Sequence, residues 1–343
     1  MILSTCQSGY EAVLARELAG RGARIAAQGR GWVLADPAAG FAPATLVFAH
    51  LSLEAPRAVA EASVNGLAHA LFEAFAAGIR DEQITEPWCC WFAAAGEPEG
   101  LGQRVASVEK AFHEILRKKL GRIGRLASPH LPRGVGPTRG FFVWFTDFGQ
   151  ASVARAAERH GSRRMADDPL APSRSYLKVE EAYGILGLEP QAGESVCDLG
   201  AAPGGWSYSA ARRGARVEAV DNGPLKGGAL NHPQIQHRRQ DAFAFAPAAG
   251  KRFDWLFCDM VEEPHRVLRS IVEPWLSRGW CQRFVVNFKL GRVDPIALID
   301  ELRAAGSPLP LHAPGFRLTH LYHDRDEITA MGSVRAPAAA PRN

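Results

Sequence analysis

Short apolar runs alternate with helical patterns throughout the second half of the chain. The runs occupy residues 196–199, 217–220, 255–258 and 284–288. This alternation of strands and helices predicts a doubly wound α/β sheet with parallel strands. The polar residues in or directly after the runs are Asp198, Asp221, Asp259 and Lys289. Because ligands of open α/β sheets bind outside the carboxyl ends of the strands, we expect these side chains to converge on one crevice.

The first half of the chain mixes helical and strand-like periods in a less regular order. Apolar positions with helical spacing predict helices at residues 8–21, 60–76 and 105–120. Strand-like runs lie at residues 2–6, 31–34, 45–50, 88–94 and 140–145. The pattern predicts an α+β region, and this half of the sequence contains no glycine-rich phosphate loop.

Prolines and other turn-forming residues interrupt all periodicity at residues 166–173. We therefore predict an N-terminal α+β region at 1–165 and an α/β domain at 171–334. The alanine- and proline-rich tail at 335–343 is expected to be frayed. The length of 343 residues agrees with two domains, each large enough to bury its own core.

The composition is that of a globular protein, with 47% hydrophobic and 22% charged residues. The six cysteines are scattered and the eleven histidines show no paired ligand spacing, which predicts a reducing compartment and no metal site. The sequence has no long uncharged apolar run, and its N-terminus lacks the pattern of a signal peptide. We expect a cytoplasmic protein that does not span a membrane.

Basic residues concentrate between Arg104 and Arg139, although the net charge of +4 is too small to indicate a partner by itself. The stretch holds nine basic residues against Glu109 and Glu114, and aromatic residues lie on both sides of it. Charge mixed with aromatic side chains is typical of a surface that binds nucleic acid. The alternative is a solvated helix face followed by core strands.

The loop after the first strand of the α/β domain reads Asp198-Leu-Gly-Ala-Ala-Pro-Gly-Gly. Its glycines allow a tight turn and close approach of a ligand to the backbone. The loop is neither the dinucleotide fingerprint nor a phosphate-binding loop, so a nucleotide-like ligand without a diphosphate fits it better. Asp221 ends the next strand, where a carboxylate accepts hydrogen bonds from a ribose. These features predict S-adenosylmethionine as cofactor; the alternative is a glycine-rich turn with a helix-capping aspartate.

Six segments of the second half carry a more specific pattern. They are Pro172-Ser-Arg-Ser-Tyr-Leu-Lys, Asp198-Leu-Gly-Ala-Ala-Pro-Gly-Gly, Val220-Asp-Asn-Gly-Pro, Cys258-Asp-Met-Val-Glu, Asn287-Phe-Lys-Leu and Leu321-Tyr-His-Asp-Arg-Asp-Glu-Ile-Thr. In this order they resemble the RlmM family, the 23S rRNA cytidine 2′-O-ribose methyltransferases related to FtsJ-type enzymes. The resemblance implies a Rossmann-like methyltransferase domain that uses S-adenosylmethionine, preceded by a region with a THUMP RNA-binding domain. Over the first half the resemblance rests on the opening Leu3-Ser-Thr-Cys-Gln-Ser-Gly-Tyr-Glu, the element pattern and the basic stretch.

The resemblance also implies the residues of the site. By motif position, a catalytic Lys-Asp-Lys-Glu tetrad is formed by Lys178, Asp259, Lys289 and Glu327. The cofactor contacts that it implies are Ser175, Ala202, Pro203, Gly204, Gly205, Asp221, Asp241 and Asp259. Asp241 is expected to accept from the exocyclic amine of adenine and Phe243 to cover its ring; the alternative for Asp241 is a loop-capping aspartate. Ala202 stands where a family member carries cysteine, a small change because such a loop offers mainly its backbone.

The chemistry of ribose methylation explains why such residues are needed. A ribose hydroxyl is a poor nucleophile at neutral pH, so a neighbouring group has to withdraw its proton as the methyl group moves. A lysine can do this if burial and a neighbouring cation depress its pKa. We assign Lys289 as the proton acceptor and Lys178 as the second positive charge, oriented by the two carboxylates. The alternatives are a solvent-facing Lys178 and a surface Glu327 in a hairpin turn.

Three other functions agree less well with the sequence. A base methyltransferase would need an Asn/Asp-Pro-Pro-Tyr-like segment or a nucleophilic thiol, where this chain has Cys258-Asp-Met-Val. A catalytically silent RNA-binding or assembly factor has no need to keep all four tetrad residues. A nicotinamide-dependent dehydrogenase would need the spacing G-x-G-x-x-G, which is missing. We expect 23S rRNA rather than DNA as partner, because only RNA offers a 2′-hydroxyl, and we favour a monomer.

Overall fold

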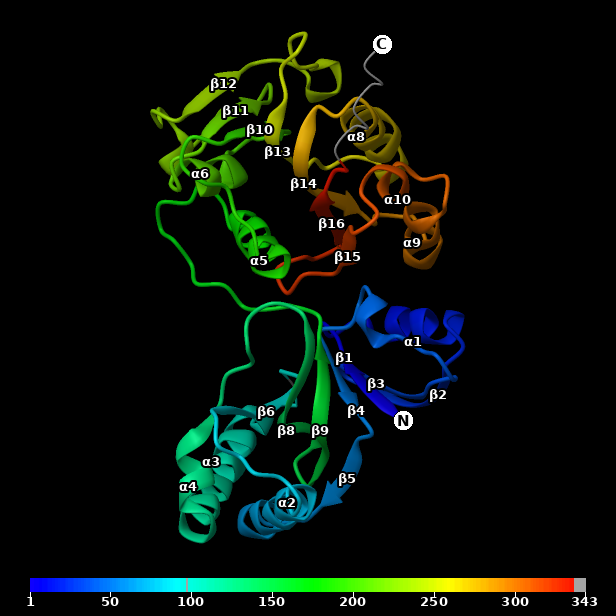
Figure 1. The fold of residues 1–343 in the computed structure, drawn as a ribbon, viewed down its shortest axis with the longest axis vertical. Helices are drawn as coiled ribbons and strands as arrows, with labels where there is room; N and C mark the ends of the chain where they lie inside the picture. Colours follow the sequence, from blue (N-terminus) through cyan, green and yellow to red (C-terminus); the bar gives the residue numbers. More distant parts are fainter. Residues whose placement is uncertain (97, 336–343) are drawn as a thin grey trace. The chain divides into compact units, whose positions relative to one another are not determined.

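The computed structural model describes residues 1–96 and 98–335, so the tail expected to be frayed lies outside the described residues except for Arg335. The chain divides into two compact units, Met1–Gly161 and Ser162–Asn343 (Figure 1). The division falls shortly before residues 166–173, where the periodicity of the sequence stops.

The N-terminal unit is built on one mixed sheet. Its strands are β1 (Ile2–Thr5), β2 (Arg24–Gly29), β3 (Trp32–Asp36), β4 (Leu51–Glu54), β5 (Arg57–Ala60), β6 (Trp88–Ala94), β7 (Ala127–Ser128), β8 (Gly136–Asp147) and β9 (Gln150–Arg159). They follow the order β2-β3-β1-β4-β9-β8-β6-β7, and β5 pairs with β9. Strand β6 runs parallel to β7 and β8, whereas β8 and β9 form a long antiparallel pair.

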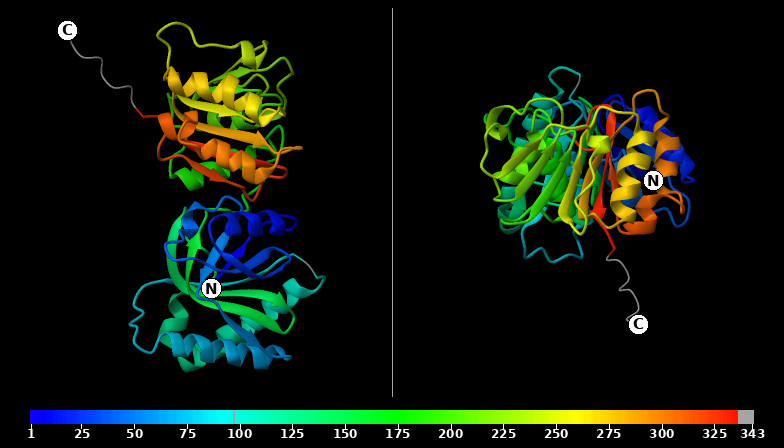
Figure 2. Two further views of the ribbon diagram at one scale, coloured as in Figure 1. Left: turned by 90° about the vertical axis from the view of Figure 1, so that its right-hand side faces the viewer. Right: turned by 90° about the horizontal axis from the view of Figure 1, so that it is seen from above.

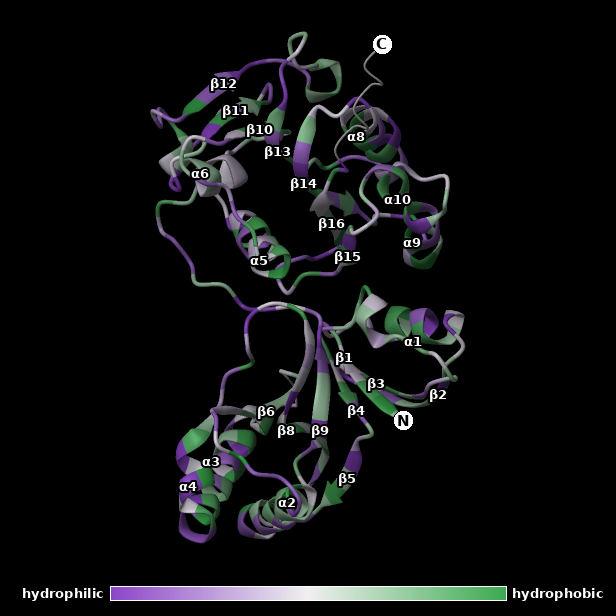
Figure 3. Cartoon of the chain, viewed as in Figure 1, coloured by the Kyte–Doolittle hydropathy of each residue, from purple (hydrophilic) through white to green (hydrophobic). Residues whose placement is uncertain are grey.

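Helices complete the N-terminal unit. They are α1 (Glu11–Gly20), α2 (Val64–Gly78), α3 (Leu101–Lys119) and α4 (Gly121–Leu126). Helices α2 and α3 pack on the sheet around Phe75, Phe112 and Phe141, whose rings contact one another. Hydrophobic and hydrophilic positions alternate around α3 (Figure 3), as in a helix with one buried face.

The run at residues 45–50, predicted to be a strand, is buried at 46–49 but forms no strand. The backbone N–H groups of Val47 and Phe48 donate to the carboxylate of Glu17 on α1, at 2.7 and 3.0 Å. A buried side chain therefore provides the hydrogen bonds that a neighbouring strand would otherwise supply. The apolar pattern reported burial correctly, and the strand β4 begins only at Leu51.

The C-terminal unit is a doubly wound α/β sheet, so the predicted fold class is confirmed. Its strands are β10 (Ser195–Leu199), β11 (Arg216–Val220), β12 (Ile235–Arg238), β13 (Phe253–Cys258), β14 (Cys281–Lys289), β15 (Arg317–Thr319) and β16 (Glu327–Ser333). Their order is β12-β11-β10-β13-β14-β16-β15. The strands from β10 to β14 pair in parallel, whereas β16 is antiparallel to both of its neighbours.

Helices cover both faces of this sheet. They are α5 (Tyr176–Leu186), α6 (Gly205–Ala211), α7 (Pro264–Val267), α8 (Glu273–Ser277), α9 (Pro295–Arg303) and α10 (Pro308–His312). Helices α5 and α6 lie on one face, and α8, α9 and α10 lie on the other, where the turned view shows them in yellow and orange across the strands (Figure 2). Because strands β10 to β14 run in parallel, their carboxyl ends share one edge of the sheet, and the site is built there.

Within the described part of the chain, no helix is both long enough and apolar enough to cross a membrane. The same residues contain no group of three or more His, Cys, Asp or Glu side chains placed to hold a metal ion. All six cysteines are buried free thiols.

Candidate active site

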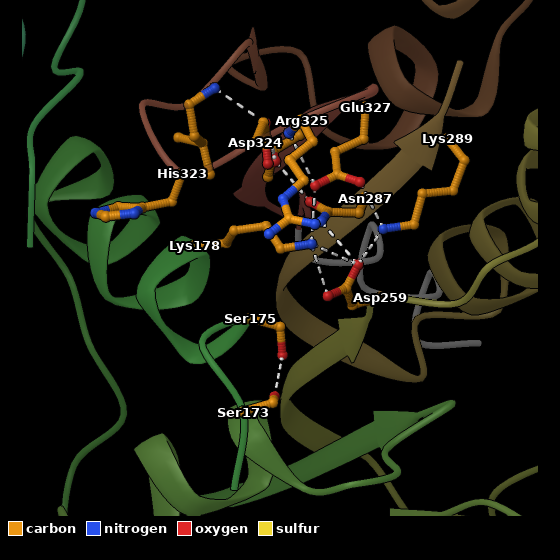
Figure 4. A network of polar contacts seen from close by, with 12 residues as sticks. Ser173, Ser175, Lys178, Asp259, Asn287, Lys289, His323, Asp324, Arg325 and Glu327 are labelled. Carbon is orange, nitrogen blue, oxygen red and sulfur yellow. Dashed lines mark hydrogen bonds and ion pairs between the residues drawn. The ribbon is translucent and has the colours of Figure 1, made fainter. Parts of the chain in front are cut away.

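Four charged residues meet at the carboxyl ends of the central strands, although they come from four separate elements (Figure 4). Asp259 directly follows β13, and Lys178 lies in the first turn of α5. Lys289 is the last residue of β14 and Glu327 the first residue of β16, and the antiparallel register places them opposite each other. We call these four residues the tetrad.

The tetrad is a closed network of hydrogen-bonded ion pairs. Lys178 Nζ lies 2.8 Å from Asp259 Oδ2 and 3.0 Å from Glu327 Oε1. Lys289 Nζ lies 2.6 Å from Asp259 Oδ1 and 2.8 Å from Glu327 Oε2. Each carboxylate thus bridges both ammonium groups, and the network holds two positive and two negative charges.

Burial sets the energetics of the tetrad. Lys178 and Glu327 are each only 7% exposed, so neither is the solvent-facing residue that the sequence alternatives allowed. Burial alone raises the pKa of Glu327, but the nearby Lys178 and Lys289 ammonium groups outweigh it and lower this pKa to about 2. Glu327 is therefore ionised at neutral pH, and its charge depends on the two lysines.

The pKa of Lys289 differs from the expectation drawn from the sequence. We expected burial and a neighbouring cation to depress it, and burial does act in that direction. The charges and hydrogen bonds of Asp259 and Glu327 act more strongly, and they raise the pKa of Lys289 above its ordinary value. With these contacts Lys289 is an ammonium group at neutral pH and not a ready base.

The glycine-rich loop after β10 leaves no room for side chains at two positions. Gly200 and Gly204 have φ values of +73° and +105°. A Cβ atom at Gly200 would collide with Met260, and one at Gly204 would lie 2.5 Å from the Cβ of Ala229. The loop therefore presents backbone at the sheet edge, as a closely bound ligand would require.

Asp221 holds this loop in place. Its Oδ2 accepts a hydrogen bond from the backbone N–H of Ala202 at 2.9 Å, and its Oδ1 accepts from Gly223 at 2.7 Å. A carboxylate has about four acceptor positions, so capacity remains for further donors such as ribose hydroxyls. The backbone carbonyl of Pro203 accepts from Lys226 at 2.9 Å, which ties the loop to the segment after β11.

Asp198 does not line the expected crevice. It is 1% exposed and accepts a hydrogen bond from the hydroxyl of Ser207 on α6, at 2.6 Å. Burial raises the pKa of Asp198 to about 7, with the Ser207 hydrogen bond acting in the opposite direction. Asp198 lies within β10 and not after it. Its contact with Ser207 joins this strand to α6, the helix that follows the glycine-rich loop.

Two other predicted cofactor contacts lie at different places, Asp241 after β12 and Ser175 beside the glycine-rich loop. Ser175 borders it, because a Cβ atom on Gly205 would lie 3.0 Å from Ser175 Oγ. Asp241 is exposed and accepts from the backbone N–H of Phe243 at 2.9 Å, so it does cap a loop, as the alternative had it. The guanidinium of Arg266 lies 3.9 Å from the centre of the Phe243 ring and covers one face of it.

Sequence reasoning missed three polar residues beside the tetrad: Asn287, Thr329 and Asp324. Asn287 Nδ2 donates to Asp259 Oδ1 at 2.9 Å, and all three residues are buried. A signal was present, since Asn287 is a polar residue inside an apolar strand, and a buried amide requires hydrogen-bond partners.

Most of the basic stretch lies on α3 and α4, whereas Arg133 and Arg139 lie beyond α4 and Arg104 is half-buried. The exposed cations at the end of α3 and on α4 are Arg117, Lys118, Lys119, Arg122 and Arg125. The aromatic residues on either side of the stretch do not extend this surface, because most of them are core residues. Those buried are Trp88, Phe92, Phe141, Phe142 and Trp144. The expected mixture of charge and stacking is thus wrong, and what the exposed part of the stretch presents is positive charge.

Comparison with known proteins places the chain among methyltransferases. Residues 171–299 match the family model of FtsJ-like methyltransferases. A protein from Alkalilimnicola ehrlichii named ribosomal RNA large subunit methyltransferase M is 42% identical over 249 residues, which cover 66% of this chain and 67% of the relative. A protein of the same name from Xanthomonas oryzae pv. oryzae is 33% identical over 356 residues, covering 96% of this chain and 98% of the relative. The similarity extends over both units.

Replacing Glu327 by glutamine should destabilise the C-terminal unit by about 3 kcal/mol at pH 7, because it leaves two buried ammonium groups with one carboxylate. Hydrogen exchange of the β14 and β16 amides measures this local free energy. The difference from wild type should be present above pH 4.5, the ordinary pKa of a glutamate, and should vanish as the pH falls towards 2, where wild-type Glu327 is itself protonated.

Asp326→Asn is the matched control, because Asp326 is exposed and an asparagine can still accept from the backbone of Gly291. We expect this variant to change the free energy of opening by less than about 0.5 kcal/mol. Equal effects of the two substitutions would contradict the role of Glu327 as a charge partner of the lysines.

Proposed function

Because the chain belongs to the family of ribosomal RNA large subunit methyltransferase M proteins, we propose that it methylates the 2′-oxygen of a cytidine ribose in 23S rRNA. The family resemblance read from the motifs is confirmed, and with it a large-subunit rRNA methyltransferase with a Rossmann-like fold that uses S-adenosylmethionine. The finer assignment, to the ribose of a cytidine, is the proposal. The observation that carries it is the closed Lys-Asp-Lys-Glu network at the sheet edge.

The tetrad suits a reaction at a hydroxyl group. A ribose 2′-hydroxyl has to lose its proton while its oxygen gains a methyl group, so a proton acceptor is needed beside it. Lys178 has three acceptor contacts within the tetrad, to both oxygens of Asp259 and to Glu327. Lys289 has two such contacts and is the more exposed of the two side chains, at 18% against 8%. The Lys289 nitrogen thus keeps one bonding direction that no tetrad carboxylate occupies. A substrate oxygen could lie there, which supports Lys289 as the proton acceptor.

The residues around the loop fit S-adenosylmethionine. Close backbone at Ala202, Pro203, Gly204 and Gly205 suits a flat, nucleoside-sized ligand, and Asp221 retains acceptor capacity for its ribose. Ser175 borders the loop beside α5, so the same helix would contact the cofactor and carry Lys178. Asp241 is exposed beyond β12, where its second oxygen would accept from adenine. The bound cofactor supplies an electrophilic methyl group on a positively charged sulfur.

The chain's own residues hold the acceptor in place. Asp259 and Glu327 each accept one hydrogen bond from the Lys289 nitrogen. These two contacts fix the direction in which the third bonding site of the nitrogen points. When Lys289 is neutral, its lone pair can take the proton of the 2′-hydroxyl, and the resulting ammonium is stabilised by the same two carboxylates. Lys178 contacts both carboxylates, and its charge helps to keep Glu327 ionised. Alignment of the reacting groups supplies further acceleration.

RNA binding is proposed for the N-terminal unit, as a THUMP-type region. Its support is the exposed basic end of α3 together with α4. We place the protein in the cytoplasm as a monomer that acts on 23S rRNA or its precursor. The N-terminal region at 1–165 would hold the RNA, and the domain at 171–334 would carry out the reaction.

Base methylation through a cysteine nucleophile is the less supported alternative. Cys258 is 0% exposed, and burial raises the pKa of its thiol to about 12. A nucleophilic cysteine needs access and a lowered pKa, so Cys258 does not meet the requirement. The intact tetrad argues against a silent RNA-binding factor, because two buried ion-paired lysines are costly to keep without a role.

Wild-type protein should transfer labelled methyl groups from S-adenosylmethionine to unmodified 23S rRNA at a site that becomes resistant to alkaline cleavage. Lys289→Ala and Lys289→Arg should both lower the single-turnover rate by at least about 100-fold, since alanine has no acceptor and arginine does not lose its proton. Lys251→Ala is the control, because Lys251 pairs with Glu218 before β13, at the opposite end of that strand from Asp259. A product that remains sensitive to alkali would contradict ribose methylation.

The single-turnover rate should rise about tenfold per pH unit from pH 7 to pH 9 if Lys289 has to lose its proton before transfer. The sign follows from the raised pKa of Lys289, which leaves only a small neutral fraction that grows with pH. The profile is measured with saturating cofactor and rRNA. A rate that does not change over this range would show that Lys289 acts as a fixed cation.

Reversing the charge of Arg117 and Lys118 to glutamate should weaken rRNA binding about tenfold or more at low salt and leave the affinity for S-adenosylmethionine unchanged. Both side chains are exposed at the end of α3. The control reverses Arg16 and Arg24, two exposed arginines on α1 and β2. Filter binding at several salt concentrations gives the affinity and its salt slope, and an equal loss in both variants would argue against a specific surface.

A further inference from the structure

A second cross-strand pair lies next to the tetrad. In the antiparallel register of β14 and β16, Asn287 pairs with Thr329 and Lys289 pairs with Glu327, so the two pairs are two residues apart on each strand. Side chains two residues apart on a strand share a face of the sheet, so both pairs point to the same side. Asn287 and Thr329 are 0% exposed, and the adjacent Asp324 is 1% exposed. Polar groups buried this deeply need hydrogen-bond partners.

These three residues form one chain of contacts that ends on the tetrad; Figure 4 labels Asn287 and Asp324 beside Asp259. Asn287 Nδ2 lies 2.9 Å from Asp259 Oδ1. Thr329 Oγ1 lies 2.6 Å from Asn287 Oδ1 and 3.0 Å from Asp324 Oδ2. The loop before β16 is thus connected to the catalytic carboxylate through buried side chains.

The number of available protons determines which group donates and which accepts in each of these hydrogen bonds. Asp259 already accepts from two ammonium groups, so Asn287 has to turn its NH₂ group to Asp259 and its carbonyl oxygen to Thr329. Two oxygens 2.6 Å apart need a proton between them, and the single hydroxyl proton of Thr329 is the one available there. The contact between Thr329 and Asp324 then needs a proton from Asp324, which requires a neutral carboxyl group.

The surroundings of Asp324 agree with a neutral group. Its Oδ1 has no hydrogen-bond partner among residues 1–96 and 98–335. Its Oδ2 also accepts from the backbone N–H of Leu321, at 2.9 Å. Burial raises the pKa of Asp324 well above its ordinary value, and repulsion from Glu327 adds to the effect, while Leu321 and Lys178 oppose it.

We propose that Asp324, Thr329 and Asn287 form a directed hydrogen-bond chain that holds the carboxylate of Asp259 in position for methyl transfer. The inference rests on the proposed function of the tetrad. The three are positioning residues, since they act through Asp259. Among the residues that the structure describes, Asn287 is the neutral donor on Asp259 Oδ1, beside the two ammonium groups. Without it, the orientation of the carboxylate depends on the two flexible lysine side chains alone, and Lys289 is held less firmly in its direction.

Thr329→Val tests the chain, because valine has nearly the same shape as threonine and removes only the hydroxyl group. We expect the single-turnover rate to fall about tenfold, while the KM for rRNA and the Kd for S-adenosylmethionine stay at their wild-type values. Thr329→Ser restores the hydroxyl and should recover most of the rate. A wild-type rate in Thr329→Val would overturn the proposal.

Thr319→Val is the matched control for packing. Thr319 pairs with Thr329 across β15 and β16 and is also buried, and its hydroxyl has no hydrogen-bond partner within the described ranges. This variant should keep the wild-type rate. An equal loss in Thr319→Val and Thr329→Val would show general damage to the sheet and overturn the positioning role.

Infrared difference spectra test the protonation of Asp324 independently of activity. The spectrum of wild type minus Asp324→Asn at pH 7 should contain the C=O band of a protonated carboxyl group, and Thr329→Val should shift that band. A carboxylate band in its place would overturn the proposal. Absence of methyl transfer by the wild type would refute the proposed function alone, because the infrared result still decides whether the directed chain exists.

Discussion

Two lysine ammonium groups share the same two carboxylates, and this balance of buried charge constrains the surrounding fold. A buried ion that loses its partner costs several kcal/mol, so each tetrad side chain has to reach its partners within hydrogen-bond distance. The register of β14 and β16 achieves this for Lys289 and Glu327 by pairing them directly. A slip of one residue would turn one of the two to the opposite face of the sheet. The antiparallel strand added to a parallel sheet is therefore what closes the network.

The helix that carries Lys178 is held by a separate buried carboxylate. Glu181, one turn further along α5, is 1% exposed and accepts backbone hydrogen bonds from Arg163, Tyr322 and His323 at 2.9, 2.9 and 3.2 Å. Two of these donors lie in the loop that leads into β16. Glu181 thus ties the start of α5 to the segment before Glu327, and the distance between Lys178 and Glu327 depends on this contact. Trp206 adds a second tie, from α6 to the carbonyl of Ser175, at 2.9 Å.

The sequence predicted the parts of the fold and site that follow from strand ends. Charges after apolar runs indicated Asp259 and Lys289, because parallel strands end at one edge. It did not reveal that residues 45–50 satisfy their backbone through Glu17, since apolar spacing reports burial and not the hydrogen-bond partner. It also gave the wrong direction for the pKa of Lys289. That pKa depends on how many carboxylates touch the nitrogen, a count that only the three-dimensional contacts provide.

The raised pKa of Lys289 connects the stability of the tetrad with its proposed chemistry. The two carboxylates balance the two ammonium groups, so the tetrad is most stable with the proton on Lys289. All three N–H groups of Lys178 are engaged in the tetrad, whereas Lys289 has one N–H group without an acceptor there. The contacts that stabilise the tetrad therefore distinguish the two lysines. The proposed role of proton acceptor falls to Lys289 because only this lysine keeps a direction at its nitrogen that no tetrad carboxylate occupies.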